Sequence, residues 1–335
     1  MVTRGNITES KHYGAFVVVD SLGNIIASGG NPNFVTFMRS SSKPLQILSL
    51  LERGGVDRFG FTEQEIALMC SSHSGTDEQV SILKRLQDKV GISPEDLLCG
   101  ISPPSDKKTY KRMLKEGEIP TTLRHNCSGK HTGMIALAKL LDVPYTNYIS
   151  PEHPVQKLII ETFADMVNIS SEKIVLGIDG CSAPVFAIPL YNAALSYARL
   201  CDPDKHAMAC KLVTKSMSKN PGMVAGPGRF DTRVMKEFKG TLVSKTGAEG
   251  YQAIGILPDA TRKGSPGIGI CLKILDGDPE QRARSTALIE ILLQLSLMPL
   301  EYVEQLADFY SRPVKNWQKM DVGEIRPCFN ITHAR

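Results

Sequence analysis

The segment "RSSSKPLQILSLL" (Arg39–Leu51) joins a cluster of serines directly to an apolar run, and this junction decides the fold. Apolar residues recur at helical spacing after the junction, at Leu45, Ile47, Leu48 and Leu51. Pro44 lacks an amide proton, so it is tolerated only in the first turn of a helix. The segment therefore predicts a buried helix that begins at about Ser40 to Lys43 and stops before the glycine pair at 54–55.

Ser40 and Lys43 are three residues apart, which places their side chains within contact on one face of a helix. Such a pair can supply a nucleophile and its base, provided that the amine is neutral. A free lysine with a pKa of about 10.4 is neutral in only roughly one molecule in 2,500 at pH 7. Burial or a second cation would have to lower the pKa toward about 7–8. The simpler alternative is a group of capping serines followed by a lysine that reaches solvent.

Two further motifs strengthen the catalytic interpretation. The segment "ALMCSSHSG" (Ala67–Gly75) places Ser72 and His73 between an apolar run and a glycine turn, and "LVSKTGAEG" (Leu242–Gly250) ends a strand at Lys245. Ser-x-x-Lys followed later by a strand that ends in Lys-Thr-Gly is typical of acyl-transferring serine enzymes of the β-lactamase and penicillin-binding type. Neither motif is specific alone, but their order along the chain favours this class.

The elements along the chain predict an α+β fold in a single domain over residues 1–335. A hairpin is expected at 15–28 and further strands between 240 and 276, followed by a helix at about 279–297. Helices are expected between these ends, at about 63–69, 78–90, 134–141, 153–166 and 207–219. One antiparallel sheet built from residues 12–30 and 240–276, with a helical subdomain inserted over about 44–235, satisfies this order.

A second group of reactive residues lies in two glycine-containing turns. "LRHNCSGKHTGM" (Leu123–Met134) carries Cys127, Lys130 and His131, and "GIDGCSAP" (Gly177–Pro184) carries Asp179 and Cys181. Thiolates with an imidazole, a carboxylate or a neutral amine can bind zinc. Lysine is a rare ligand because it must first lose its proton. By spacing alone, two tight turns with buried thiols explain the pattern better than a metal site.

Composition excludes several classes of function. The net charge of +4 on 335 residues is weak, and no basic run with interleaved aromatics suggests binding to nucleic acid. No stretch has the apolar length needed to span a membrane, and the first residues lack an apolar signal region. Eight cysteines without a CxxC pair favour free thiols or metal ligands over a disulfide framework. We therefore expect a cytoplasmic protein.

Taken together, six motifs resemble those of the rhizobial-type L-asparaginases, the asparaginase II family, in the same order along nearly the whole chain. They are "RSSSKPLQ", "ALMCSSHSG", "HNCSGKHTGM", "GIDGCSAP", "MVAGPGRFDT" and "KTGAEGYQAIG". The resemblance implies a fold like that of the serine β-lactamases, a homodimer, and hydrolysis of L-asparagine to L-aspartate and ammonia. It also implies a zinc ion held by Cys127, Lys130 and Cys181. The departures are mild, with serines at 41, 42 and 71 where alanine is common.

The resemblance further implies two Ser-Lys pairs in one pocket, Ser40 with Lys43 and Ser72 with Lys245. We expect Ser40 to attack the side-chain amide with Lys43 as its base, and the second pair to relay the proton. Arg39 is a candidate for binding the substrate α-carboxylate, with a surface ion pair as the alternative. Asp179 is a candidate for the α-ammonium or for orienting the zinc ligands.

His73 and His131 are candidates for supporting the site, although a core histidine is the default for each. Three alternatives remain open at this point: a glutaminase, a β-lactam hydrolase on the same scaffold, and a non-catalytic zinc-binding protein. The last would not need both serines and both lysines together.

Overall fold

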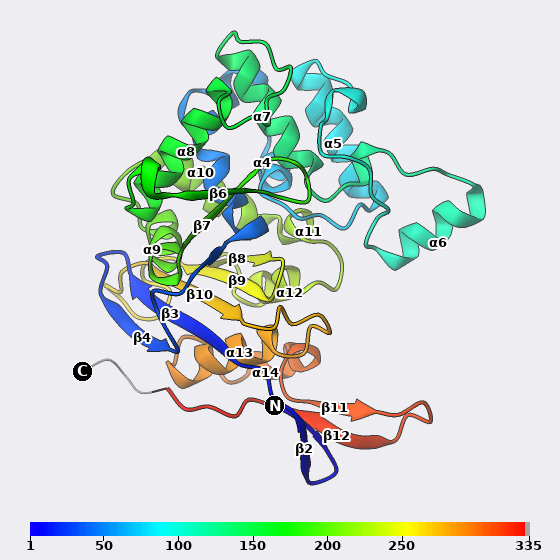
Figure 1. The fold of residues 1–335 in the computed structure, drawn as a ribbon, viewed down its shortest axis with the longest axis vertical. Coiled ribbons are helices and arrows are strands. Elements are labelled where there is room, and N and C mark those ends of the chain that lie inside the picture. Colours follow the sequence, from blue (N-terminus) through cyan, green and yellow to red (C-terminus); the bar gives the residue numbers. More distant parts are fainter. Residues whose placement is uncertain (332–335) are drawn as a thin grey trace.

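A central five-stranded antiparallel sheet organises the protein (Figure 1). The computed structural model describes residues 1–331. The strand order is β4 (Ile25–Gly29), β3 (Gly14–Asp20), β10 (Ile268–Ile274), β9 (Tyr251–Ile256) and β8 (Leu242–Gly247). Both ends of the chain thus contribute to one sheet, and β8 is an edge strand. The structure is of the mixed α and β class with antiparallel sheets.

Helices cover both faces of this sheet. Helix α9 (Leu190–Cys201) packs on one face and α13 (Arg284–Gln294) on the other (Figure 1). A Cβ atom at Gly269 would lie 1.8 Å from the carbonyl oxygen of Ala194, so only glycine permits this approach of α9 to β10. Because both faces are covered, β9 and β10 are buried along their whole length.

The inserted part of the chain is mostly helical. Its longer helices are α4 (Glu63–Met69), α5 (Asp77–Val90), α6 (Lys107–Glu116), α7 (Ser128–Leu140), α8 (Pro154–Val167), α10 (Ala207–Lys219) and α12 (Phe230–Glu237). The short helices α3 (Gly55–Phe59) and α11 (Pro221–Val224) connect them, and α14 (Tyr302–Gln305) follows α13. Capping boxes at Thr62 and Thr76 fix the starts of α4 and α5.

The predicted helix after Ser40 is broken into three short pieces. They are the 3-10 turn η1 (Arg39–Ser42), α1 (Lys43–Gln46) and α2 (Leu48–Glu52). Helix α7 begins at Ser128, six residues before its predicted start at Met134, because its glycines were interpreted as a turn. Those glycines serve packing instead, since a Cβ atom at Gly129 would lie 2.3 Å from the carbonyl oxygen of Leu68.

Two small sheets were not predicted. Strands β5 (Val35–Phe37), β7 (Pro184–Pro189) and β6 (Val175–Ile178) form one. Strands β11 (Arg312–Lys315), β12 (Asp321–Ile325), β1 (Val2–Arg4) and β2 (Ile7–Ser10) form the other. Most of these strands are short and partly exposed, so they lack a clear hydrophobic pattern.

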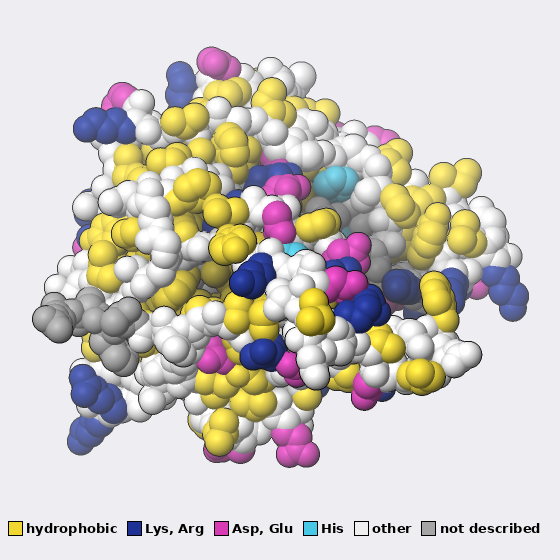
Figure 2. Space-filling view, turned by 60° about the horizontal axis from the view of Figure 1, so that its bottom comes forward, with side chains coloured by type: hydrophobic (Ala, Val, Ile, Leu, Met, Phe, Trp, Pro, Cys, Tyr) yellow, Lys and Arg dark blue, Asp and Glu magenta, His cyan; other side chains and the backbone are white. Residues whose placement is uncertain are grey.

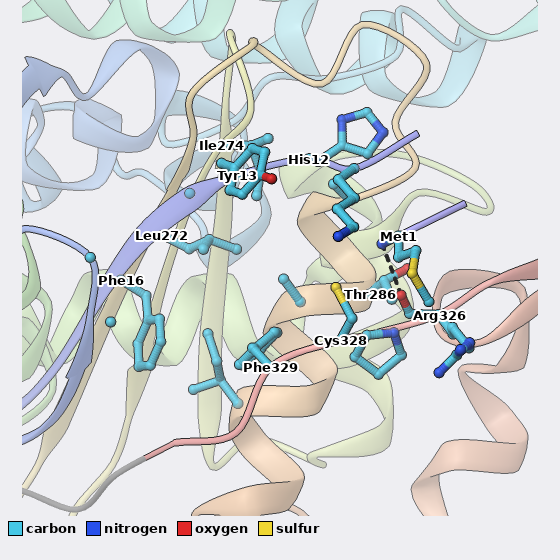
Figure 3. Close-up of a pocket in the computed structure, with 18 of the residues that line it drawn as sticks. Met1, His12, Tyr13, Phe16, Leu272, Ile274, Thr286, Arg326, Cys328 and Phe329 are labelled. Carbon is cyan, nitrogen blue, oxygen red and sulfur yellow. Dashed lines mark hydrogen bonds between the residues drawn. The ribbon is translucent and has the colours of Figure 1, made fainter. Parts of the chain in front are cut away.

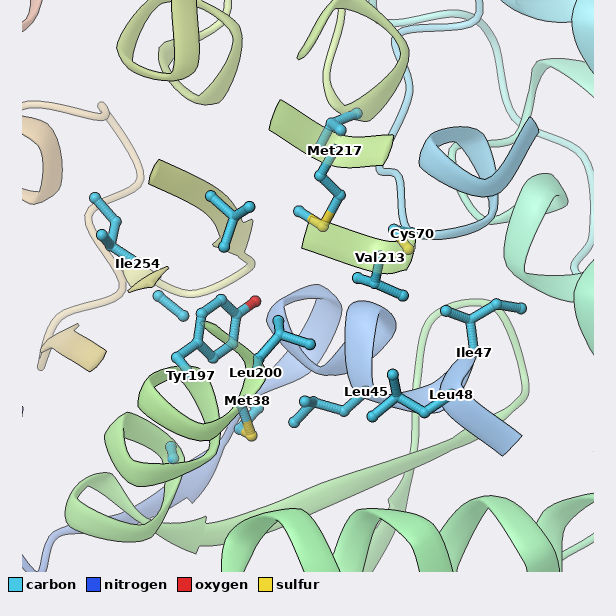
Figure 4. Packing of buried hydrophobic residues seen from close by; sticks show 14 of the residues in the cluster. Met38, Leu45, Ile47, Leu48, Cys70, Tyr197, Leu200, Val213, Met217 and Ile254 are labelled. Carbon is cyan, nitrogen blue, oxygen red and sulfur yellow. The ribbon is translucent and has the colours of Figure 1, made fainter. Parts of the chain in front are cut away.

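The apolar core continues from the sheet into the helical part and holds η1 in place. Leu45 and Leu48 lie below Val213 of α10 in this core, and Met38 lies beside Tyr197 (Figure 4). Tyr197 of α9 is fully buried and donates a hydrogen bond to the carbonyl oxygen of Ser41 at 2.7 Å. The turn that carries Ser40 is therefore fixed by both packing and a buried hydrogen bond.

The surface has no dominant charge on the face seen in Figure 2, where side chains of both signs are interspersed with hydrophobic ones. Within residues 1–331, no helix combines the length and the apolar character that crossing a membrane requires.

Candidate active site

The four predicted catalytic residues come from four segments that meet at the edge of the central sheet. Ser40 and Lys43 lie on η1 and α1, Ser72 lies in the segment after α4, and Lys245 lies on β8. Both lysines are buried, with 1% exposure for Lys43 and none for Lys245. A buried lysine needs polar partners, and their positions show how this site is built.

Ser72 is the point at which the two amines converge. The distance from Lys245 Nζ to Ser72 Oγ is 2.8 Å, and that from Lys43 Nζ is 3.1 Å. The three residues are far apart in sequence, so only the tertiary fold brings them together. The structure thus places one hydroxyl group between two buried amines.

Lys43 is surrounded by acceptors. Its Nζ donates to the carbonyl oxygens of Ser71 at 2.7 Å and Asn126 at 3.2 Å, in addition to Ser72 Oγ. Three acceptors match the three N–H donors of a protonated amine. The geometry therefore suits Lys43 as a fixed cation beside the Ser72 hydroxyl.

Lys245 has the opposite character. Burial, followed by the charge of Lys43, lowers the pKa of Lys245 to about 7. The charge of Asp231 acts the other way and that of Arg229 lowers the pKa further. An amine with this pKa is substantially neutral near pH 7 and can accept a proton. The Ser72 hydroxyl can then donate to Lys245 while Lys43 donates to the same oxygen.

Asp231, which the sequence analysis missed, supports the strand that carries Lys245. Its carboxylate accepts hydrogen bonds from the Ser244 hydroxyl at 2.7 Å, the Gln252 side-chain amide at 2.8 Å and the Thr246 backbone amide at 2.8 Å. Burial acts to raise its pKa, but the charge of Lys245 and these bonds hold the pKa below its usual value. The motif "GRFDT" was the only signal, and one acid in a motif does not reveal its partners.

Ser40 does not make the predicted contact with Lys43. Within residues 1–331, its hydroxyl has no hydrogen bond to the Lys43 amine, whose donors are used by other groups. The expectation assumed a regular helix, whereas Lys43 opens α1 after a 3-10 turn and directs its amine toward Ser72. Ser40 is half-buried, and the preceding Arg39 has a left-handed backbone with φ of 51°.

Arg39 and Asp179 form an ion pair with each other. The Nε and Nη2 atoms of Arg39 each lie 2.8 Å from Asp179 Oδ1, which also accepts from the Gly180 amide. Burial acts to raise the pKa of Asp179, but the charges of Lys130 and Arg39 keep the pKa below its usual value. Arg39 directly precedes Ser40 in sequence, so the ion pair places a cation and an anion beside this serine.

The two histidines are held within the protein. His73 is 1% exposed, with Nε2 at 2.8 Å from Ser128 Oγ and Nδ1 accepting from the Gly75 amide. Burial lowers the pKa of His73 to about 3, so its ring is neutral. Both ring nitrogens have partners within the protein, and a role for His73 in substrate binding stays a prediction. His131 Nδ1 lies 2.6 Å from the Tyr148 hydroxyl.

The predicted zinc ligands lie together. Cys127, Lys130 and Cys181 are all nearly fully buried, and Lys130 Nζ lies 3.0 Å from Cys181 Sγ. A hydrogen bond from Cys181 keeps the pKa of Cys127 well below its usual value. Around a tetrahedral zinc, a sulfur and a nitrogen donor would be about 3.5 Å apart and two sulfur donors about 3.8 Å apart. The donor set therefore fits zinc in its chemistry and spacing.

The rest of the described chain offers no other obvious metal site. Within residues 1–331, no cluster of three or more His, Cys, Asp or Glu side chains could hold a metal ion. The predicted zinc site contains only two side chains of these types, Cys127 and Cys181. Its third predicted ligand is a lysine, Lys130.

A cavity of about 280 Å³ between β3, β10 and α13 is separate from this site (Figure 3). Its lining includes Phe16, Leu272 and Phe329 and none of the ten predicted site residues. This apolar cavity is thus not where the candidate chemistry lies.

A serine hydroxyl in contact with a buried amine of lowered pKa is typical of hydrolases in which a lysine, rather than a histidine, can act as the base. The model of the L-asparaginase II family matches residues 1–327. The chain therefore belongs to the L-asparaginase II family and is a member of a family of amidohydrolases.

Two solved structures show weaker similarity. One is a Bacillus glutaminase in 4.3 M NaCl, at 14% identity over 79% of this chain and 84% of that one, with a TM-score of 0.33. The other is a probable glutaminase from Bacillus subtilis complexed with 6-diazo-5-oxo-L-norleucine, at 15% identity over 79% and 78%, with a TM-score of 0.33. Neither similarity enters the argument below. No match was found among curated proteins.

Proposed function

We propose that the protein hydrolyses L-asparagine to L-aspartate and ammonia through an acyl-enzyme formed on a serine. The observation that carries this proposal is the 2.8 Å contact between Ser72 Oγ and Lys245 Nζ, together with the lowered pKa of Lys245. Membership of the L-asparaginase II family supports the choice of substrate.

We assign the attack to Ser72, because its hydroxyl lies in contact with both lysine amines. Lys245 takes the hydroxyl proton as the serine oxygen bonds to the side-chain amide carbon of asparagine. The Lys43 ammonium, 3.1 Å from the same oxygen, stabilises the negative charge that develops on it. The Lys245 ammonium then returns the proton to the leaving nitrogen, and ammonia departs.

Deacylation reverses these roles. Lys245 takes a proton from water, the resulting hydroxide attacks the acyl carbon, and the proton returns to Ser72 as L-aspartate leaves. Ser40 remains one of the four proposed catalytic residues and supplies a second hydroxyl group. Its side chain is half-buried and has no hydrogen bond to Lys43, so it is free to contact the substrate.

The Arg39–Asp179 pair supports an α-amino acid as the substrate. Asp179 is bonded through Oδ1, which leaves Oδ2 for an α-ammonium, and Arg39 bonds through Nε and Nη2, which leaves Nη1 for an α-carboxylate. Asp179 is only 10% exposed at its side chain, so the charged ends of a zwitterion would meet partly desolvated partners.

A zinc ion bound by Cys127, Lys130 and Cys181 would supply a fixed positive charge that orients the substrate or the site. This assignment is part of the proposal and rests on the spacing and chemistry of the donors. Asn126 links the two regions, because its carbonyl oxygen accepts from Lys43 and its side-chain oxygen lies 3.1 Å from Cys127 Sγ.

Glutamine hydrolysis is the main alternative, because one methylene separates the two substrates and is worth only about 1–3 kcal/mol in a tight pocket. A β-lactam hydrolase on the same scaffold would use the same serine and lysines. A non-catalytic zinc protein would not require the convergence of Lys43 and Lys245 on Ser72.

We also propose the serine β-lactamase-like fold, a homodimer and a cytoplasmic location. The Ser-x-x-Lys turn packed against a late Lys-Thr-Gly edge strand supports the fold. All eight cysteines are free, which supports a reducing compartment. The family resemblance alone supports the dimer, and sedimentation analysis of the purified protein tests it.

A substrate panel tests the activity. Ammonia release from L-asparagine, release from L-glutamine and opening of a chromogenic β-lactam are compared for the wild type, Ser72→Ala and Ser216→Ala. Ser216 is the matched control because its hydroxyl is buried in α10 without a hydrogen-bond partner. We expect fast release from asparagine by the wild type and Ser216→Ala, and loss in Ser72→Ala. Faster turnover of glutamine or of the β-lactam than of asparagine would contradict the proposed substrate.

A covalent probe separates the two serines. A diazo-ketone analogue of asparagine alkylates the attacking hydroxyl, and peptide mapping locates the adduct. The contacts predict the adduct on Ser72; an adduct on Ser40 would restore the assignment expected from the family resemblance and make Ser72 the proton relay.

A further inference from the structure

A polar cavity of about 370 Å³ lies beside the end of β8, among the start of α12, the start of α13 and the segment around the start of β11. Thr246 lines it, whereas the adjacent Lys245 points to Ser72. Neighbouring residues of a strand face opposite sides of a sheet. The cavity and the candidate active site are therefore on opposite faces of the same edge strand.

Three guanidinium groups line this cavity, those of Arg229, Arg284 and Arg312. Arg312 donates to the carbonyl oxygens of Asp308 and Gln281, at 3.2 and 3.0 Å. Within residues 1–331, none of the three arginines has a carboxylate within 4.0 Å of its guanidinium nitrogens. Three cations thus face one space without a carboxylate in contact, although the charges of Asp231 and Asp278 act on Arg284 from farther away.

Arg284 is the most exceptional of the three. It is the first residue of α13, where the positive end of the helix dipole disfavours a cation. Its Nε atom is buried and has no hydrogen-bond partner among the described residues. The backbone amides at the start of α13 are already occupied, because the Asp278 carboxylate accepts hydrogen bonds from the amides of Arg282, Ala283 and Arg284.

The carboxylates at the cavity do not neutralise these cations. The Asp308 and Glu280 side chains are 83% and 68% exposed, and their nearest cations are Arg233 at 3.8 Å and Arg282 at 3.7 Å. The acidic groups therefore face solvent at the rim, while the three guanidinium groups line the interior.

A partly buried guanidinium without an ionic partner in contact is costly, and an anion that receives its N–H groups reduces that cost. Planar guanidinium forks match the two oxygens of a carboxylate or a phosphate. We propose that this cavity is a binding site for a small oxyanion, a carboxylate or a phosphate, held by Arg229, Arg284 and Arg312. The proposal uses none of the catalytic residues and stands independently of the proposed hydrolysis.

Calorimetric titration of the full chain tests the site. The protein is kept in chloride at constant ionic strength and titrated with inorganic phosphate in one arm and malonate in the other. Arg284→Gln and Arg229→Gln remove one guanidinium each. Arg85→Gln is the control, because it removes the same charge from an exposed helical position. Circular dichroism establishes that each variant is folded.

We expect saturable binding of at least one of the two anions by the wild type and by Arg85→Gln. Each cavity variant should bind it at least about 10-fold more weakly, the effect of losing a charged hydrogen bond. Binding in the phosphate arm only, or in the malonate arm only, identifies the type of oxyanion. No saturation by either anion below about 10 mM, the range of non-specific contacts, would overturn the proposal. Equal affinity in a folded Arg284→Gln or Arg229→Gln protein would do the same. Ammonia release, measured on the same samples, reports on the proposed hydrolysis separately.

Discussion

Two buried lysines of this protein, Lys245 and Lys130, have almost the same exposure and opposite electrostatic surroundings. Lys245 lies near Lys43 and Arg229, and burial together with these cations lowers its pKa to about 7. Lys130 lies among Cys181, Cys127 and Asp179, and although burial acts to lower its pKa, these groups raise the pKa above its usual value. Burial alone therefore does not decide the protonation of a lysine; the charges of its neighbours do.

This difference separates two kinds of chemistry in one protein. The amine beside Ser72 is suited to exchanging protons near neutral pH, whereas the amine beside the thiols is held as a cation, and a metal bound there would have to displace its proton. The two regions are connected through Asn126, which contacts both Lys43 and Cys127. The following predictions test this division, from the largest expected effect to the smallest.

Replacing Lys245 should have the largest effect. In Lys245→Met the Ser72 hydroxyl loses its proton acceptor, so kcat for asparagine should fall by about 10²–10⁴-fold, the contribution of a general base. Ammonia release measures kcat, and Lys205→Met, which removes an exposed lysine, is the control. A decrease of less than 10-fold in the folded variant would mean that another group is the base.

Zinc content should depend on the cluster of Cys127, Lys130 and Cys181. Protein purified without chelator should carry about one zinc per chain, and Cys181→Ser should reduce this to about a tenth or less, because loss of a ligand or its support weakens binding by ~10–100-fold. Elemental analysis measures the ratio, and Cys271→Ser is the control for loss of a buried thiol. Equal zinc in wild type and Cys181→Ser would exclude this cluster as the site.

The neighbours of Lys245 should shift the pH profile in opposite directions. Asp231 raises the pKa of Lys245, so Asp231→Asn should move the acidic limb of kcat/KM to lower pH. Lys43 lowers that pKa, so Lys43→Gln should move the limb to higher pH. A displacement of about one unit corresponds to roughly 1.4 kcal/mol of interaction. Shifts in the same direction would show that these charges do not act on the base.

Stability should respond least, and with a defined sign. The folded pKa of Lys245, about 7, lies below its unfolded value of 10.5, so the unfolded chain binds more protons between these limits. The wild type should therefore gain stability as the pH rises from about 7 to 10.5. Below about pH 7 the free-energy cost of burying the charged Lys245 amine is fully present. Lys245→Met should unfold at a temperature a few degrees higher than the wild type at pH 7. This gap should narrow toward pH 10, and thermal unfolding at both pH values measures it.

Local patterns were sufficient for much of the fold. The hairpin at 15–28 and the helices at 63–69 and 207–219 were predicted nearly residue for residue, because apolar periodicity and glycine or proline boundaries are local signals. The family resemblance, which the match to residues 1–327 confirms, identified the candidate residues in distant segments. Their grouping around Ser72 follows from the tertiary structure.

The pairing of these residues was not predictable from local rules. Helical spacing suggested Ser40 as the partner of Lys43, but the Lys43 amine contacts Ser72, 29 positions away in sequence. Lys245 and Ser72 are 173 positions apart, so their contact depends on the sheet edge meeting the end of α4. Asp231 and the Arg39–Asp179 pair depend equally on long-range packing, which a single sequence does not display.

The most direct test of the account is the titration of Lys245 itself. The Cε resonance of this residue in ¹³C-lysine-labelled protein is assigned by its absence in Lys245→Met and followed from pH 5 to pH 11. The account predicts a midpoint near pH 7. A midpoint above about pH 9, close to that of an ordinary lysine, would contradict it and leave Ser72 without a base.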